Sequence, residues 1–233
     1  MIKAVLFDLR GTLVDVAKAQ LATRDFLYLQ FGRSLSREGF DDAFHASKTE
    51  IIEKLGRNSS IINWDLLIIT NLMNRLNAKI DGGKLEKMMA EYNSIFVSNV
   101  SLFLDVEPCL RFLKDKNLKL GVVIEGTSSR EKAVLAKLGL DKFFNVVVIS
   151  EEVGHNKLSL LPLQKAVEKV GLPPGEIIVV GDRIDKDVAH ANKLGCTSVL
   201  IQRGQKQSLE NLQREAMPNY VISKLTELAN FIE

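Results

Sequence analysis

The first residue that could do chemistry is Asp8, which follows an apolar run near the start of the chain. Residues 2–7 are mostly apolar, and Asp8 leads into a turn that contains Gly11 and Thr12. A buried strand that ends in this way places a carboxylate at its tip, with backbone amides nearby to receive an anion. Asp is common at strand ends, so Asp8 alone is weak support for a site.

A second apolar run, residues 177–180, is followed by Asp182, Asp185 and Asp187 in a turn that opens a helix. Three carboxylates in six residues repel one another unless a cation compensates them, and a hard divalent metal with oxygen ligands does so. The alternative is that Asp185 and Asp187 cap the helix, and for Asp185 both interpretations stay open. We predict that Asp8, Asp182 and Asp187 converge at strand ends to hold a divalent metal beside an anionic ligand.

Two further loops carry groups that suit an anion. After the apolar run 120–124 and Glu125, Gly126 and the hydroxyls of Thr127 and Ser128 precede a helix, which is an anion-receiving arrangement. Lys157 lies in the loop after the next such run. A single loop lysine is usually solvated, but this one is placed to neutralise crowded carboxylates and a bound phosphate.

These residues need a scaffold that brings strand ends together, and the apolar pattern predicts one. Several strand-like runs are nearly continuous in apolar character, as expected when helices cover both faces of a parallel sheet. From residue 118 onward they alternate with helical stretches at 130–138, 161–170, 185–194 and 224–232, the rhythm of a doubly wound α/β fold. The predicted strands are residues 2–7, 120–124, 146–149, 177–180, 198–201 and 220–222.

The segment between the first two strands breaks this rhythm and predicts an inserted, all-helical cap domain. Its apolar residues recur at helical spacing, as at Leu66, Ile69, Met73 and Leu76, after a plausible cap at Asn63. Such an insertion would sit over the carboxyl ends of the strands as a candidate lid, or it would be a packing module with no role in substrate choice. The predicted domains are residues 1–14 and 100–233 for the α/β core and residues 15–99 for the cap.

Bulk properties fit a folded protein and exclude several classes. The 233 residues are 46% hydrophobic and 26% charged, which allows a full core. The net charge of +2 builds no single-sign field for nucleic acid or an anionic membrane. The amino terminus lacks a signal-peptide pattern and no apolar run could span a bilayer, so we expect a cytoplasmic protein. Whether it is a monomer or a homodimer stays open.

The strand-terminal sites, in this order, resemble the haloacid dehalogenase superfamily along essentially the whole chain. The resemblance rests on Phe7-Asp8-x-x-Gly11-Thr12-Leu13, on Gly181-Asp182-x-x-x-x-Asp187, on Lys157 between them, and on Lys-Leu-Gly-Leu-Asp-Lys-Phe-Phe at residues 137–144. The helical insertion resembles the cap of the phosphoglycolate-phosphatase-like and dehalogenase-like branches. The resemblance implies a Rossmann-like parallel sheet with a helical cap.

Carried to these residues, the resemblance implies an Mg²⁺-dependent phosphatase of a small phosphorylated metabolite. Asp8 would be the nucleophile that forms an aspartyl-phosphate intermediate. Asp182, Asp8 and the backbone carbonyl of Arg10 would ligate Mg²⁺, and Asp187 would hold the water shell of the metal or Lys157. Lys157 would offset charge on the nucleophile and the phosphoryl group. The implied substrate-binding residues are Thr12, Glu125, Gly126, Thr127 and Lys157.

The sequence departs from the superfamily at two of these sites. Its phosphatases place a second Asp, the general acid and base, two residues after the nucleophile; here Arg10 stands there, and a guanidinium cannot shuttle that proton. They usually show Ser or Thr and then Asn or Asp where this chain has Ile124 and Glu125, so a phosphoryl-binding hydroxyl is missing unless Thr127 substitutes. We predict a salt bridge between Arg10 and Glu125 in the cleft. The rival interpretation leaves Arg10 free to bind an anionic group of the substrate.

Three functions stay open on the sequence alone. The first is the phosphatase, attenuated by Arg10. The second is a 2-haloacid dehalogenase, because those members of the superfamily also lack the second Asp; they carry Tyr there and Ser-Asn at the second site, and this chain has neither. The third is a catalytically inactive descendant that binds a phosphorylated ligand or a protein partner.

Overall fold

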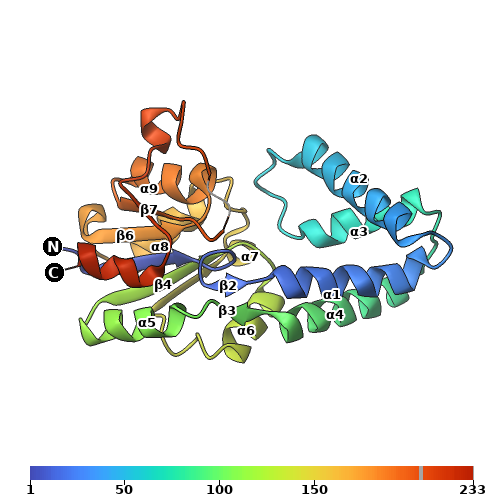
Figure 1. The fold of residues 1–233 in the computed structure, drawn as a ribbon, viewed down its shortest axis with the longest axis horizontal. Coiled ribbons are helices and arrows are strands. Elements are labelled where there is room, and N and C mark those ends of the chain that lie inside the picture. Colours follow the sequence, from blue (N-terminus) through green and yellow to red (C-terminus); the bar gives the residue numbers. More distant parts are fainter. Residues whose placement is uncertain (205–206, 233) are drawn as a thin grey trace. The chain divides into compact units, whose positions relative to one another are not determined.

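The computed structural model describes residues 1–204 and 207–232. The chain divides into two compact units, one formed by Met1–Asp15 with Ser101–Glu233 and the other by Val16–Val100. Each boundary lies one residue after the position expected from the sequence. The first unit contains the sheet and the second is helical (Figure 1).

The sheet of the first unit has six parallel strands in the order β5-β4-β1-β6-β7-β8. All six strands predicted from the sequence are present, and their ends lie within two residues of the prediction. The fold class, a doubly wound α/β core, is confirmed. The bounds are β1 (Ala4–Asp8), β4 (Lys119–Ile124), β5 (Val146–Ile149), β6 (Ile177–Gly181), β7 (Thr197–Ile201) and β8 (Tyr220–Ile222).

Helices cover this sheet, and two of them define the face that matters for the site. Alternate residues of β1, Ala4 and Leu6, share a buried cluster with Ala166 of α8 and Ala191 of α9. Because side chains alternate along a strand, Asp8 is directed to the same face as Leu6. The α-helices of the core unit are α5 (Val106–Asp115), α6 (Ser128–Lys137), α7 (Ser150–Val153), α8 (Leu161–Val170) and α9 (Ala189–Leu194).

Some segments of the core unit differ from the expected helices. The stretch 185–194 begins as a π-helical turn, Ile184–Val188, before α9. The stretch 224–232 is a 3₁₀ helix, Leu225–Phe231, and Pro174–Glu176 and Arg214–Ala216 are further 3₁₀ turns. Two short strands that the sequence did not indicate, β2 (Val14–Asp15) and β3 (Ser101–Leu102), pair antiparallel where the chain leaves and re-enters the core unit.

The second unit is helical, as expected. Asn63 caps α3, since its Oδ1 accepts a hydrogen bond from the backbone N–H of Leu66 at 3.1 Å. Its core joins residues from all the helices, among them Phe26, Phe40, Leu72 and Met88. The elements are α1 (Ala17–Leu27), a π-helical turn (Tyr28–Gly32), α2 (Arg37–Leu55), α3 (Trp64–Arg75) and α4 (Gly82–Asn99). Among the described residues, no helix has the length and apolar character to cross a bilayer.

We expect Leu72→Ala to lower the free energy of unfolding by about 2–5 kcal/mol, because removing a fully buried side chain leaves a cavity. The measurement is urea unfolding of the whole chain followed by circular dichroism. Leu29→Ala is the matched control, since Leu29 is 53% exposed and its truncation should cost no more than about 0.5 kcal/mol. Equal losses in both variants would contradict this account of the helical core.

Candidate active site

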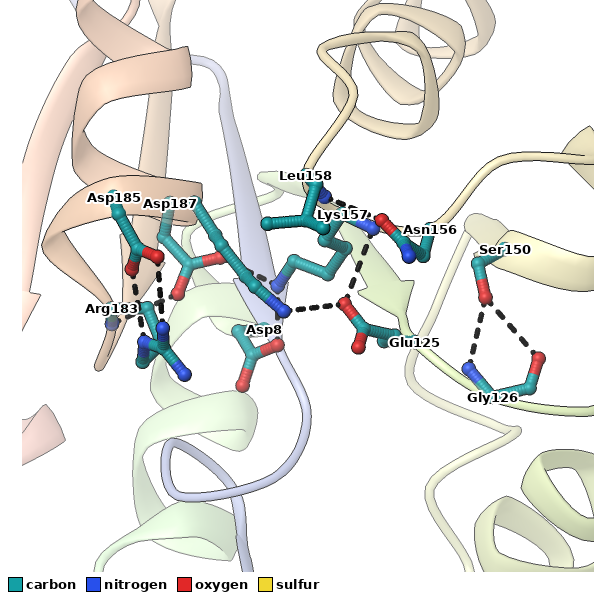
Figure 2. A network of polar contacts seen from close by, with 11 residues as sticks. Asp8, Glu125, Gly126, Ser150, Asn156, Lys157, Leu158, Arg183, Asp185 and Asp187 are labelled. Carbon is teal, nitrogen blue, oxygen red and sulfur yellow. Dashed lines mark hydrogen bonds and ion pairs between the residues drawn. The ribbon is translucent and has the colours of Figure 1, made fainter. Parts of the chain in front are cut away.

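Asp8 is the last residue of β1, which lies in the middle of the sheet between β4 and β6. It pairs in register with Val123 of β4, and the preceding residue, Phe7, pairs with Val180 of β6. The strand order reverses direction at β1, so Asp8 stands at the switch point where open α/β sheets bind ligands. The strand thus places the candidate nucleophile as the sequence predicted (Figure 2).

Asp8, Asp182 and Asp187 come together at this edge of the sheet. One carboxylate oxygen from each lies within 4.8 Å of the others. Two glycines permit this approach: a Cβ on Gly11 would collide with the Asp182 carboxylate, and a Cβ on Gly181 would collide with Asp187. Gly11 also has a φ of +80°, a conformation that L side chains rarely adopt. The convergence predicted from the sequence is therefore present.

Lys157 is the cation at the centre of this cluster. Its Nζ forms ion pairs with Asp8 and with Asp187, and the three side chains are almost completely buried. Burial disfavours the ammonium form, but the carboxylates of Asp187 and Asp8 outweigh that effect and raise the pKa of Lys157. Lys157 is thus charged and neutralises crowded carboxylates, as predicted from its loop.

The pKa values of Asp8 and Asp182 are raised above the usual range for an aspartate. Burial is the largest cause that raises the pKa of Asp8 to about 7; Lys157 opposes the shift, and Asp187 and Asp182 add to it. Burial, with the Asp187 charge next, raises the pKa of Asp182 to about 6. Both groups hold protons more tightly than usual, chiefly because they are buried and also because other carboxylates lie close to them.

The cluster has the composition of a divalent cation site. When all four are ionised, the carboxylates of Asp8, Asp182, Asp187 and Glu125 carry two more charges than Lys157 and Lys186, the two lysines that form ion pairs with members of this group. Asp8 Oδ2 is buried and has no hydrogen-bond partner among the described residues. Carboxylate oxygens are the donors that a hard cation such as Mg²⁺ prefers. The residues therefore fit a divalent metal.

Asp185 lies outside this cluster. Two of its hydrogen bonds come from the Arg183 guanidinium, at 3.0 and 2.8 Å, and its side chain is exposed. Asp185 lies within the helical turn Ile184–Val188, and the residue before this turn, Arg183, makes no side-chain capping bond. Asp185 was expected either to bind the metal or to cap the helix, and the structure shows neither. Its carboxylate instead forms an ion pair with Arg183.

The structure gives Arg10 an ion-pair partner other than the predicted Glu125. The Arg10 guanidinium pairs with Glu131 of α6, whose side chain is fully buried and also accepts a bond from Arg130 Nε at 3.0 Å. Gly126 makes room for this carboxylate, since a Cβ there would collide with Glu131. The sequence did not indicate Glu131 as a partner of Arg10. Acidic residues are common in the first turn of a helix, and nothing in the sequence shows which of them pairs with a residue far away in the chain.

Glu125 takes a different partner, Lys186, which the sequence analysis also missed. Lys186 Nζ lies 2.8 Å from Glu125 Oε2, and the same oxygen accepts the backbone N–H of Lys157 at 3.2 Å. Figure 2 shows the Glu125 carboxylate directed toward Lys157, beside Asp8. The one feature of the sequence that could have indicated this ion pair is the position of Lys186 between Asp185 and Asp187.

The remaining predicted substrate-binding residues lie in tight turns. Thr12 is fully buried; its hydroxyl has no hydrogen-bond partner in residues 1–204 and 207–232, and its carbonyl accepts from Arg203 at 2.8 Å. The Gly126 amide donates to Ser150 Oγ at 2.9 Å, so it is already satisfied. Thr127 flanks α6 without a side-chain capping bond. Their contact with a substrate stays a prediction.

A small cavity lies behind the nucleophile. It has a volume of about 10 Å³, and the residues lining it include Asp8, Lys157, Asp187, Lys186 and His190. That volume is about what one water molecule needs, and the lining offers polar partners for one. Burial is the main cause that lowers the pKa of His190. The imidazole therefore favours its neutral form beside the cluster.

The comparisons with known proteins agree with this site. The family model described as haloacid dehalogenase-like hydrolase matches residues 5–201. The chain is similar, at 30% identity over all of this chain and 97% of the relative, to glyceraldehyde 3-phosphate phosphatase of Methanopyrus kandleri. It is 24% identical to ribulose-1,5-bisphosphate 5-phosphatase of Halopiger xanaduensis, with all of both chains covered.

A solved structure shows the same relationship. The crystal structure of a HAD phosphatase from Thermococcus onnurineus aligns with a TM-score of 0.71 at 25% identity and covers 99% of this chain and 97% of that one. The matched family model spans most of the chain and includes Asp8, Lys157, Asp182 and Asp187. The chain therefore belongs to the haloacid dehalogenase-like hydrolase family, and within it is a phosphohydrolase.

Proposed function

We propose that this protein is an Mg²⁺-dependent phosphatase of a small phosphorylated sugar that acts through an aspartyl-phosphate on Asp8. The observation that carries the proposal is the convergence of Asp8, Asp182 and Asp187 around Lys157 at the switch point of the sheet. The substrate class is supported by relatives named for glyceraldehyde 3-phosphate and ribulose 1,5-bisphosphate. The expected cytoplasmic location and monomeric or homodimeric state stay predictions.

In the proposed reaction an Asp8 oxygen attacks phosphorus, and the bond from phosphorus to the leaving oxygen breaks with its electron pair on that oxygen. Water then cleaves the acyl phosphate, which releases orthophosphate and restores the carboxylate. Lys157 orients Asp8 and offsets its charge. Asp8, Asp182 and the Arg10 carbonyl would hold Mg²⁺, with Asp187 supporting Lys157 or the water shell. The bound metal would neutralise charge on the phosphoryl oxygens.

Arg10 limits the rate of the proposed reaction. The guanidinium cannot donate or accept the proton that passes between the leaving group and water, and it forms an ion pair with Glu131. Both steps then proceed without a positioned acid or base, which typically costs about 10²–10⁴-fold in rate. We infer that the phosphatase is slow on alkyl phosphates and faster on esters whose leaving group needs no proton.

The inserted helical unit is the part of the proposal that concerns substrate choice. The chain enters it directly after the turn that follows Asp8 and returns at β3, just before α5. Insertions at such a point commonly supply lids in open α/β proteins. We propose that the unit selects the substrate and is more than a packing module.

Asp8→Asn should reduce hydrolysis of p-nitrophenyl phosphate to background, because an amide oxygen is a poor nucleophile. The measurement is p-nitrophenolate release in Mg²⁺ at pH 7.5. Asp185→Asn is the matched control and should keep most of the activity, since Asp185 pairs with Arg183 outside the cluster. Activity that survives in Asp8→Asn would refute the proposed nucleophile, and halide release from a 2-haloacid without metal would favour the dehalogenase.

Restoring an acid at position 10 should raise the rate on alkyl phosphates by about 10²–10⁴-fold. The cleanest variant is Arg10→Asp combined with Glu131→Gln, because Arg10→Asp alone leaves the buried Glu131 carboxylate with fewer cationic partners. The measurement is the ratio of kcat/KM for an alkyl phosphate and for p-nitrophenyl phosphate. Glu131→Gln alone is the control. An unchanged ratio in the double variant would contradict the assigned effect of Arg10.

Mg²⁺ affinity should fall as the pH decreases from 8 to 5.5. With pKa values of about 7 and 6, Asp8 and Asp182 take up protons in this range when metal is absent, so protons compete with Mg²⁺. Isothermal titration calorimetry in buffers of different ionisation enthalpy measures both the affinity and the protons released at pH 6.5. Asp182→Asn should weaken binding strongly and Asp185→Asn should not. Binding that releases no protons would show that these carboxylates are not the ligands.

A further inference from the structure

Lys186 bridges the two strands that flank the nucleophile. It lies in the helical turn Ile184–Val188 after β6, and its ammonium reaches Glu125, the residue that follows β4. In the sheet, β1 lies between β4 and β6. An ion pair from the β6 side to the β4 side therefore crosses the tip of β1, where Asp8 stands. Lys186 and Asp8 also line the same cavity.

The Lys186 ammonium has unused hydrogen-bonding capacity. An ammonium offers three donors. Within the described part of the chain, the one hydrogen-bond acceptor for Lys186 Nζ is Glu125, whereas Lys157 Nζ is held by both Asp8 and Asp187. The side chain of Lys186 is 16% exposed and that of Lys157 is 8% exposed. Lys186 is thus the more accessible of the two cations and keeps two donors for a ligand.

Two groups at the end of β4 cannot donate a hydrogen bond to a ligand. Ile124, the last residue of β4, is fully buried and carries no polar group. The amide of Gly126 is occupied by Ser150. A phosphoryl oxygen at this side of Asp8 would meet the Glu125 carboxylate, which repels it unless a cation intervenes. Lys186 is the cation in that place.

We propose that Lys186 binds a phosphoryl oxygen of the substrate, with Glu125 holding the ammonium over Asp8. The proposal rests on the proposed function, because it names a further contact of the same phosphoryl group. Glu125 acts as a positioning residue: one of its oxygens accepts both the Lys186 ammonium and the Lys157 backbone N–H, which fixes the two lysines relative to each other. A lysine ammonium thus takes the place of a neutral hydroxyl donor.

The test is binding of inorganic orthophosphate to the whole protein in Mg²⁺, measured by isothermal titration calorimetry. Lys186→Met should weaken the affinity by about tenfold to a hundredfold, the usual effect of losing a hydrogen bond between charged groups. Lys186→Arg should restore most of it. Lys165→Met is the matched control and should have no effect, because Lys165 forms an exposed ion pair with Glu168 of the same 2.8 Å length.

Unchanged phosphate affinity in Lys186→Met, or no phosphate binding by the unmodified protein, would overturn the proposal. Thermal unfolding and Mg²⁺ binding of each variant establish that it is folded, and Lys186→Gln provides a second test if the methionine variant is not. The possible outcomes distinguish a failure of the proposed Lys186 contact from a failure of the proposed phosphatase activity. Phosphate binding that depends on Lys186, in a protein whose turnover does not depend on Asp8, would refute the proposed nucleophile and leave this contact in place.

Discussion

The buried ion pairs of Lys157 with Asp8 and Asp187 are the interaction on which the site depends. Removing these charges from water is costly, and it is tolerable because each carboxylate faces a cation. Burial, with the neighbouring carboxylates as a further cause, still raises the pKa values of Asp8 and Asp182. The fold thus holds excess negative charge in place where a divalent cation would be stabilised, and that charge is a property of the folded protein itself.

The scaffold supplies this arrangement with few residues. Parallel strands bring their carboxyl ends to one edge, and the reversal of strand order at β1 opens space above Asp8. Gly11 and Gly181 then let the turns after β1 and β6 approach the acidic side chains more closely than any other residue would allow. The distance between carboxylates is therefore set by backbone geometry and the missing Cβ atoms.

The strands and the convergence of Asp8, Lys157, Asp182 and Asp187 were predictable because both follow from local patterns. Apolar runs indicate buried parallel strands, and an acidic residue at each tip must meet the others at one edge. The partner of Arg10 was not predictable. Glu131 lies 121 residues away in the sequence, and an acidic residue in the first turn of a helix carries no mark of its tertiary contact.

The pairing of Arg10 with Glu131 has a consequence for how this enzyme could change over generations. A lineage that acquired an acidic residue at position 10 would leave the buried Glu131 with Arg130 and without the Arg10 guanidinium. Such an intermediate would be less stable than either end state, because a buried carboxylate would have lost a counter-ion. Such a substitution would then favour a compensating change at Glu131, so substitutions at these two positions would be coupled.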